Sequence, residues 1–255
     1  MPRRGCSLLR LSVRRARAAS GAPAPSPRGT AQGRLPAMSG VSTEWLVDRA
    51  RALGFDAAGV CDVVPSERAV RAFERWLAVG MHADMSWMAR PDRLERTFDP
   101  RRSLVGARCL LVVAQSYRPG PMSADMRRDP AHGIVAAYAS GPDYHDRLLP
   151  RLHALTADLA ARAGAEVRAV PFVDAGPLLE RDAAARAGLG FVGRNTMLIR
   201  PGLGSWSFLG ALLLDLDLPR EPAATCAPGC GDCRRCLDAC PTGALGAGYV
   251  LDARR

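Results

Sequence analysis

Residues 144–173 read YHDRLLPRLHALTADLAARAGAEVRAVPFV, and this stretch predicts a long helix followed by a strand. Apolar side chains recur at helical spacing at Leu148, Leu152, Leu155 and Leu159. Pro150 is expected to kink this helix or split it in two. The apolar run at 167–173 ends at Asp174. A helix that leads into a buried strand is typical of a layered α/β domain.

The flanking sequence extends this alternation of strands and helices. Further helices are expected at 42–53, 66–78 and 178–187, and Ser42 and Ser66 are the expected N-caps of the first two. Further strands are expected at 55–62, 109–115, 134–138 and 206–216. Irregular structure is expected at 80–102 and 117–133. The pattern predicts an α/β fold, built as α+β layers, over residues 38–217.

Charge is distributed unevenly along the 255 residues. Residues 1–37 contain eight Arg and no acid, so they supply most of the net charge of +10. The rest of the chain carries about +2, which excludes a globally basic nucleic-acid binder. We expect residues 1–37 to be a disordered Arg-rich extension, with Met38 as an alternative start; a targeting peptide is the other interpretation. No stretch reaches the roughly 18 apolar residues of a membrane helix.

A run of cysteines near the C-terminal end indicates an iron–sulfur protein. Cys230, Cys233, Cys236 and Cys240, followed by Pro241, fit the C-x2-C-x2-C-x3-C-P pattern of bacterial [4Fe–4S] ferredoxins. A zinc site is the alternative, but zinc ribbons normally use two separated cysteine pairs. Cys61 and Cys109 lie in expected core strands and are interpreted as small apolar fillers.

The ligand count of this run is incomplete. In two-cluster modules the fourth cysteine binds the other cluster. Cys230, Cys233 and Cys236 therefore need a distant fourth ligand, and Cys240 needs three partners. Cys226 lies at an irregular spacing for that role. We expect residues 218–255, which begin with a Pro-rich linker, to be a partial ferredoxin-like module in a C-terminally truncated chain.

Several motifs together resemble the epoxyqueuosine reductase family. They are FVDAGPLLER at 172–181, AGLGFVGRN at 187–195, YASGPDYH at 138–145, HADMSWM at 82–88 and the closing DARR at 252–255. The resemblance implies a nitroreductase-like, cobalamin-binding fold and two [4Fe–4S] clusters that pass electrons to cobalamin. It implies reduction of epoxyqueuosine to queuosine in tRNA with a GUN anticodon. It also implies an external electron donor and a cytoplasmic monomer without a membrane partner.

The same resemblance assigns roles to residues of the α/β domain. Asp174 is the implied proton donor, and we expect its carboxyl to be partly desolvated and therefore neutral. The alternative is that Asp174 caps a helix that begins near Pro177. The residues implied to bind cobalamin are Arg96, Tyr138, His145, Asp174, Asn195, Leu198 and Arg200. Two Arg pairs, at 234–235 and 254–255, are either tRNA phosphate contacts or solvated surface.

Two other functions stay open at this stage. A corrinoid-dependent reductive dehalogenase would share the same electron supply to cobalamin. A non-catalytic electron carrier would use the upstream domain only to dock a partner. Binding of cobalamin separates the carrier from the two enzymes.

Overall fold

The computed structural model describes residues 40–120, 122–220 and 229–255. The chain divides into two units, Met1–Ala37 and Met38–Arg255, and all described residues belong to the second. The expected disordered extension at 1–37 and most of the expected linker therefore lie outside the described residues. Among the described residues, no helix combines the length and the apolar character that a membrane span requires.

A four-stranded antiparallel sheet forms the centre of the fold. Its strand order is β1 (Ala57–Asp62), β2 (Cys109–Ser116), β6 (Ser207–Leu214) and β3 (Ala169–Phe172). In the register, Cys61 lies opposite Leu110, and Leu111 lies opposite Leu212. The expected mixture of strands and helices is confirmed. Because every pair is antiparallel, the fold belongs to the α+β form of the expected layers.

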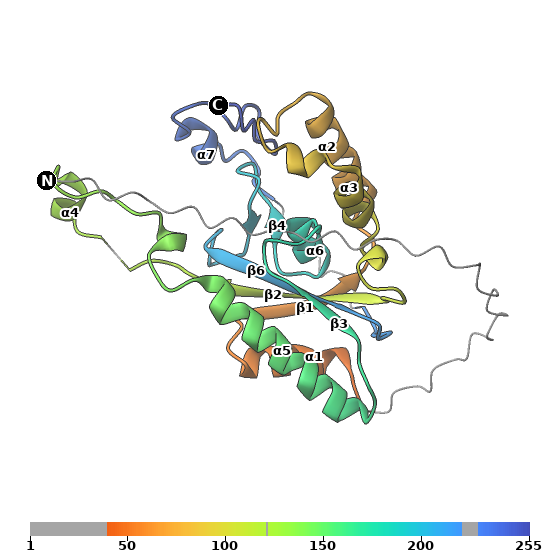
Figure 1. The fold of residues 1–255 in the computed structure, drawn as a ribbon. Coiled ribbons are helices and arrows are strands. Elements are labelled where there is room, and N and C mark those ends of the chain that lie inside the picture. Colours follow the sequence, from red (N-terminus) through yellow and green to blue (C-terminus); the bar gives the residue numbers. More distant parts are fainter. Residues whose placement is uncertain (1–39, 121, 221–228) are drawn as a thin grey trace, which may run out of the picture. The chain divides into compact units, whose positions relative to one another are not determined.

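Two helices cover one face of this sheet (Figure 1). They are α1 (Thr43–Ala52), capped by Ser42 as expected, and α5 (Tyr144–Ala163). The predicted leucine stripe of α5 is fully buried: Leu148, Leu152, Leu155 and Leu159. It packs in one core cluster with Leu111 and Leu212 of the central strands. Pro150 does not split α5, which continues as one helix.

Helix α6 (Glu180–Arg186) packs on the opposite face (Figure 1). Ala183 and Ala184 contribute to a second core cluster together with Cys61 and Leu213. Cys61 and Cys109 are both buried, which confirms their interpretation as apolar fillers. Burial raises the pKa of the Cys61 thiol to about 11 and that of the Cys109 thiol to about 12.

Several shorter elements depart from the expected pattern. Residues 80–102, expected to be irregular, contain η1 (Ser86–Ala89), α3 (Pro91–Phe98) and η2 (Pro100–Arg102), beside the expected α2 (Glu67–Ala78). The strand expected at 134–138 is wrong, because Ile134 and Val135 are exposed and pair with no strand. The remaining elements are α4 (Ala124–Arg128), η3 (Ala137–Ala139), α7 (Arg235–Asp238) and the hairpin of β4 (Phe191–Val192) and β5 (Leu198–Ile199).

Candidate functional site

Asp174 follows the end of β3 and lies in an unusual backbone conformation. Its backbone φ is +58°, in the left-handed region that residues other than Gly rarely adopt. Such a residue costs about 1–3 kcal/mol and is enriched at functional sites. Its Oδ2 accepts a hydrogen bond of 2.6 Å from the hydroxyl of Tyr144, at the start of α5. The alternative cap role is wrong, because α6 begins at Glu180 and has no side-chain cap.

Tyr144 is held by aromatic contacts on both sides. Its ring stacks on Phe208 of β6 at 4.3 Å and on His145 at 4.2 Å. His145 Nδ1 lies 2.8 Å from Asp143 Oδ1, which fixes the imidazole. Burial, followed by the hydrogen bond to Asp174, raises the pKa of Tyr144. Tyr144 therefore stays protonated and donates to Asp174.

The desolvated acid of this region is Glu180 rather than Asp174. Asp174 is exposed, so the expectation of a partly buried carboxyl there is wrong. Burial raises the pKa of Glu180 to about 7, and the nearby Asp174 charge raises it further, while Arg181 and Arg93 oppose the shift. Arg93 is fixed by a 2.9 Å hydrogen bond to the carbonyl of Gly176. Glu180 belongs to the FVDAGPLLER motif, but nothing in the local sequence indicates that it is buried.

Arg200 is a buried cation with an unsatisfied nitrogen. Only 8% of the residue is exposed, and its Nη1 has no hydrogen-bond partner in the described part of the chain. The Oγ of Ser207, at the start of β6, is buried and unpaired as well. Buried polar groups are normally hydrogen-bonded, and a buried charge without a partner is costly. These two side chains are therefore suited to an anionic or carbonyl-bearing ligand.

The other residues implied to bind a cofactor have varied surroundings. Asn195 Oδ1 accepts a hydrogen bond from the main chain of Met197, within the β4–β5 turn. Leu198 is 3% exposed and belongs to the core cluster under α6. Tyr138 is exposed, although close enough to Tyr144 to raise its pKa. Arg96 binds the carbonyl and carboxylate of Asp92 on its own helix, α3.

The four cysteines of the run lie in residues 229–255, here called the cysteine segment. All four are free thiols, and Cys233 is exposed. The Sγ of Cys230 accepts a 3.3 Å hydrogen bond from the main-chain N–H of Arg194. Main-chain N–H groups, that of Leu245 first, lower the pKa of the Cys240 thiol. These thiols have the chemistry of cluster ligands, although no three Cys, His, Asp or Glu side chains converge on one point among the described residues.

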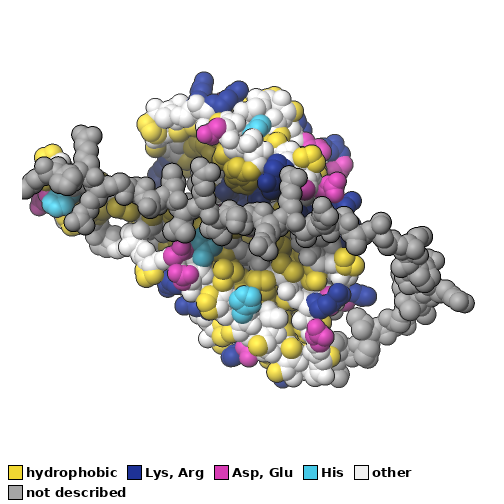
Figure 2. All heavy atoms as spheres, in the orientation of Figure 1, with side chains coloured by type: hydrophobic (Ala, Val, Ile, Leu, Met, Phe, Trp, Pro, Cys, Tyr) yellow, Lys and Arg dark blue, Asp and Glu magenta, His cyan; other side chains and the backbone are white. Residues whose placement is uncertain are grey.

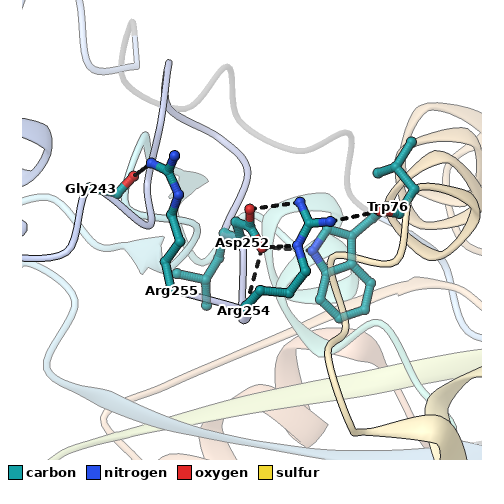
Figure 3. A network of polar contacts seen from close by, with 7 residues as sticks. Trp76, Gly243, Asp252, Arg254 and Arg255 are labelled. Atoms are coloured by element: carbon teal, nitrogen blue, oxygen red, sulfur yellow. Dashed lines mark hydrogen bonds and ion pairs between the residues drawn. The ribbon is translucent and has the colours of Figure 1, made fainter.

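The end of the cysteine segment is docked on the α/β domain (Figure 3). Trp76 Nε1 of α2 donates to the carbonyl of Leu251 at 2.6 Å, and Arg254 Nη1 donates to the carbonyl of Val79 at 3.2 Å. Arg254 also donates two hydrogen bonds to the Asp252 carboxylate, from Nε to Oδ1 at 2.7 Å and from Nη2 to Oδ2 at 2.8 Å. Hydrogen bonding from the Arg254 side chain lowers the pKa of Asp252 to about 2. The segment is thereby fixed beside α2.

The Arg pairs proposed to contact tRNA are partly used within the chain. Arg255 Nη1 donates to the carbonyl of Gly243, and Arg234 lies 3.8 Å from Asp238. On the face drawn in Figure 2, Arg side chains are interspersed with Asp and Glu side chains. This agrees with the small net charge of the chain after residue 37. A tRNA contact at these pairs stays a prediction.

A family model and the curated relatives agree on one family. Residues 97–175 match the family model described as epoxyqueuosine reductase QueG, DUF1730. The epoxyqueuosine reductase of Vibrio cholerae is 36% identical over 214 residues, which cover 83% of this chain and 55% of that protein. That of Xanthomonas campestris pv. campestris is 40% identical over 209 residues, which cover 81% of this chain and 57% of that protein.

Solved structures give the same result. A selenomethionine-labelled epoxyqueuosine reductase matches with a TM-score of 0.70 and 31% identity, over 83% of this chain and 55% of that one. An epoxyqueuosine reductase with an epoxyqueuosine-modified tRNA-Tyr stem loop matches with the same TM-score, identity and coverage. The chain thus spans about half the length of the relatives it matches.

Proposed function

The chain belongs to the epoxyqueuosine reductase family, and on that premise we propose that it serves the reduction of epoxyqueuosine to queuosine in tRNA. The observation that supports this most is the pair of Asp174 and Tyr144. A left-handed turn at the end of β3 presents the Asp174 carboxyl, and Tyr144 orients it through a 2.6 Å hydrogen bond. Both residues lie within the stretch that matches the family model.

The proposed reaction converts an epoxide into an alkene. The reaction consumes two electrons and two protons, and the epoxide oxygen leaves as water. The chemistry that cobalamin supplies when bound is the delivery of the electrons. In this proposal, Asp174 passes a proton to the oxygen as the C–O bond breaks. Because Tyr144 donates to Oδ2, the other carboxyl oxygen is the one that holds this proton. The exposure of Asp174 leaves it accessible to a substrate as large as tRNA.

Two buried polar groups, on Arg200 after β5 and on Ser207 at the start of β6, are our candidates for contacts with cobalamin. Its nucleotide loop contains a phosphodiester anion, and its corrin carries amide side chains. The unpaired Nη1 of Arg200 and the unpaired Oγ of Ser207 are partners for such groups. We propose Arg200, His145, Asn195 and Tyr138 as the polar contacts, with Leu198 as packing beneath them. The pairing of Arg96 with Asp92 gives Arg96 the weakest support of the proposed set.

We further propose two [4Fe–4S] clusters, an external electron donor, tRNA with a GUN anticodon as the partner, and a cytoplasmic monomer. Cys230, Cys233 and Cys236 would bind one cluster, and Cys240 would bind the other. The spacing of the run supports this, as do the N–H groups directed at Cys230 and Cys240. The tRNA partner is supported by the related structure that contains a modified stem loop.

Turnover with the modified tRNA tests the proposed function. The purified protein, loaded with cobalamin and anaerobically reconstituted with iron and sulfide, is incubated with a chemical reductant and tRNA that contains epoxyqueuosine. The nucleosides are then identified by mass spectrometry. Formation of queuosine is the expected result. A protein that carries both cofactors yet leaves epoxyqueuosine unchanged would contradict the proposal.

A further inference from the structure

Arg194 lies on a turn that the α/β domain holds firmly. The turn joins β4 to β5 and is closed by hydrogen bonds of 2.9 Å from Gly193 N–H to the Met197 carbonyl and from Thr196 N–H to the Gly193 carbonyl. Arg181 of α6 donates to the carbonyl of Thr196 at 3.3 Å. Arg194 therefore has a defined position relative to the sheet and to α6.

The cysteine segment contacts Arg194 from both of its ends. Near its beginning, the N–H of Arg194 donates to Cys230 Sγ at 3.3 Å and its Nη2 donates to the carbonyl of Gly231 at 2.9 Å. Near its end, the N–H of Tyr249 donates to the Arg194 carbonyl at 2.9 Å. Gly248 packs so closely that an added Cβ would lie 3.1 Å from Cβ and Cγ of Arg194.

These contacts combine anchoring with electrostatics. Main chain and side chain of Arg194 both bind the cysteine segment, so Arg194 adds a second attachment to the α/β domain beside the one at α2. The Nε of Arg194 is buried and has no hydrogen-bond partner among the described residues, so this part of the guanidinium is turned into the protein beside the cysteine segment. N–H bonds to cluster sulfurs and nearby positive charge favour the reduced, more negative cluster.

We propose that Arg194 is a positioning residue that fixes the cysteine segment to the β4–β5 turn and raises the reduction potential of the cluster bound by Cys230. The second half of this statement rests on the proposed function, because it requires the cluster. The first half does not, because the contacts are made by the protein alone. Two measurements therefore test it separately.

Hydrogen–deuterium exchange of the cluster-free chain tests the anchoring. Arg194→Met keeps the packing against Gly248 but loses the side-chain hydrogen bond to the Gly231 carbonyl. Gly248→Ala places a methyl group in close contact with Cβ and Cγ of Arg194. Gly246→Ala is the matched control, because Gly246 also has a positive φ but has no atom within 4 Å of an added Cβ. We expect faster exchange in the cysteine segment for the first two variants only, with β2 unchanged. Unaltered exchange in both would overturn the anchoring role.

A redox titration of the reconstituted chain tests the electrostatic role. Arg194→Met should shift the cluster potential to more negative values by about 59 mV, a tenfold change in the one-electron equilibrium. Arg194→Lys, which keeps the charge, should recover most of this shift. Equal potentials in all three proteins would refute the inference even if the protein reduces epoxyqueuosine. A shifted potential in a protein that never forms queuosine would instead refute only the proposed function.

Discussion

Replacing Glu180 by Gln should stabilise the protein relative to the unaltered chain, and this gain in the free energy of unfolding should be larger at alkaline pH than at acidic pH. Burial raises the pKa of Glu180 from the ordinary 4.5 to about 7. In the folded state the carboxyl therefore keeps its proton over a pH range in which the unfolded chain has released it. Folding then becomes less favourable as the pH rises from 4.5 to 7, and the penalty is complete above pH 7.

The magnitude follows from the same two values. A difference of 2.5 pKa units, from 4.5 to about 7, corresponds to about 3 kcal/mol at pH 8. At pH 5 the penalty is below about 1 kcal/mol, because most of the folded and part of the unfolded carboxyl is still protonated. Gln keeps the shape and cannot ionise. The stability difference between Glu180→Gln and the unaltered chain should thus grow by about 2–3 kcal/mol between these pH values.

Urea unfolding followed by tryptophan fluorescence at pH 5 and pH 8 measures this difference. The comparison of two proteins at each pH cancels the other titrating groups. Glu74→Gln, on an exposed position of α2, is the control and should show the same difference at both pH values. If Glu180→Gln behaves like Glu74→Gln, the carboxyl of Glu180 is not desolvated in the folded chain.

Three further substitutions test the fold by urea unfolding. Leu212→Ala, in the fully buried centre of β6, should lower the free energy of unfolding by about 2–5 kcal/mol; a loss below 1 kcal/mol would contradict the described core. Ser66→Ala removes the N-cap of α2 and should cost about 1 kcal/mol, whereas an unchanged midpoint would argue against that cap. Gly190→Ala places a Cβ 2.3 Å from the Ile199 carbonyl and should cost about 1–3 kcal/mol or more, whereas Gly133→Ala, in open space, should be neutral. Equal effects of the two glycine substitutions would mean that the hairpin is not packed as described.

The long elements of the fold could be predicted because their signals are local. The leucine stripe of α5 and the caps Ser42 and Ser66 lie within single turns of helix, and the structure has these helices within a residue or two of the expected ends. Helix α3 was not predicted, although it begins at Pro91 and Pro is favoured at the first helical position. Residues 134–138 have strand propensity but no neighbouring strand to pair with, so they remain exposed.

The candidate site could be predicted only in part, because its contacts join distant residues. Asp174 came from the family resemblance, and the sequence could not show that Tyr144, thirty positions earlier, donates to it. Burial of Glu180 has no signature in the local sequence. The bond from Arg194 to Cys230 joins residues 36 positions apart. Such contacts become visible only once the chain is folded.

The acid role of Asp174 is tested most directly by the rate of queuosine formation in a single turnover. The unaltered protein and Asp174→Asn are compared with both cofactors loaded, and the cobalamin spectrum verifies equal loading. Loss of a general acid should slow the reaction by about 100-fold or more. A rate within about twofold of the unaltered protein, at equal cobalamin loading, would contradict the assignment of Asp174 as the proton donor.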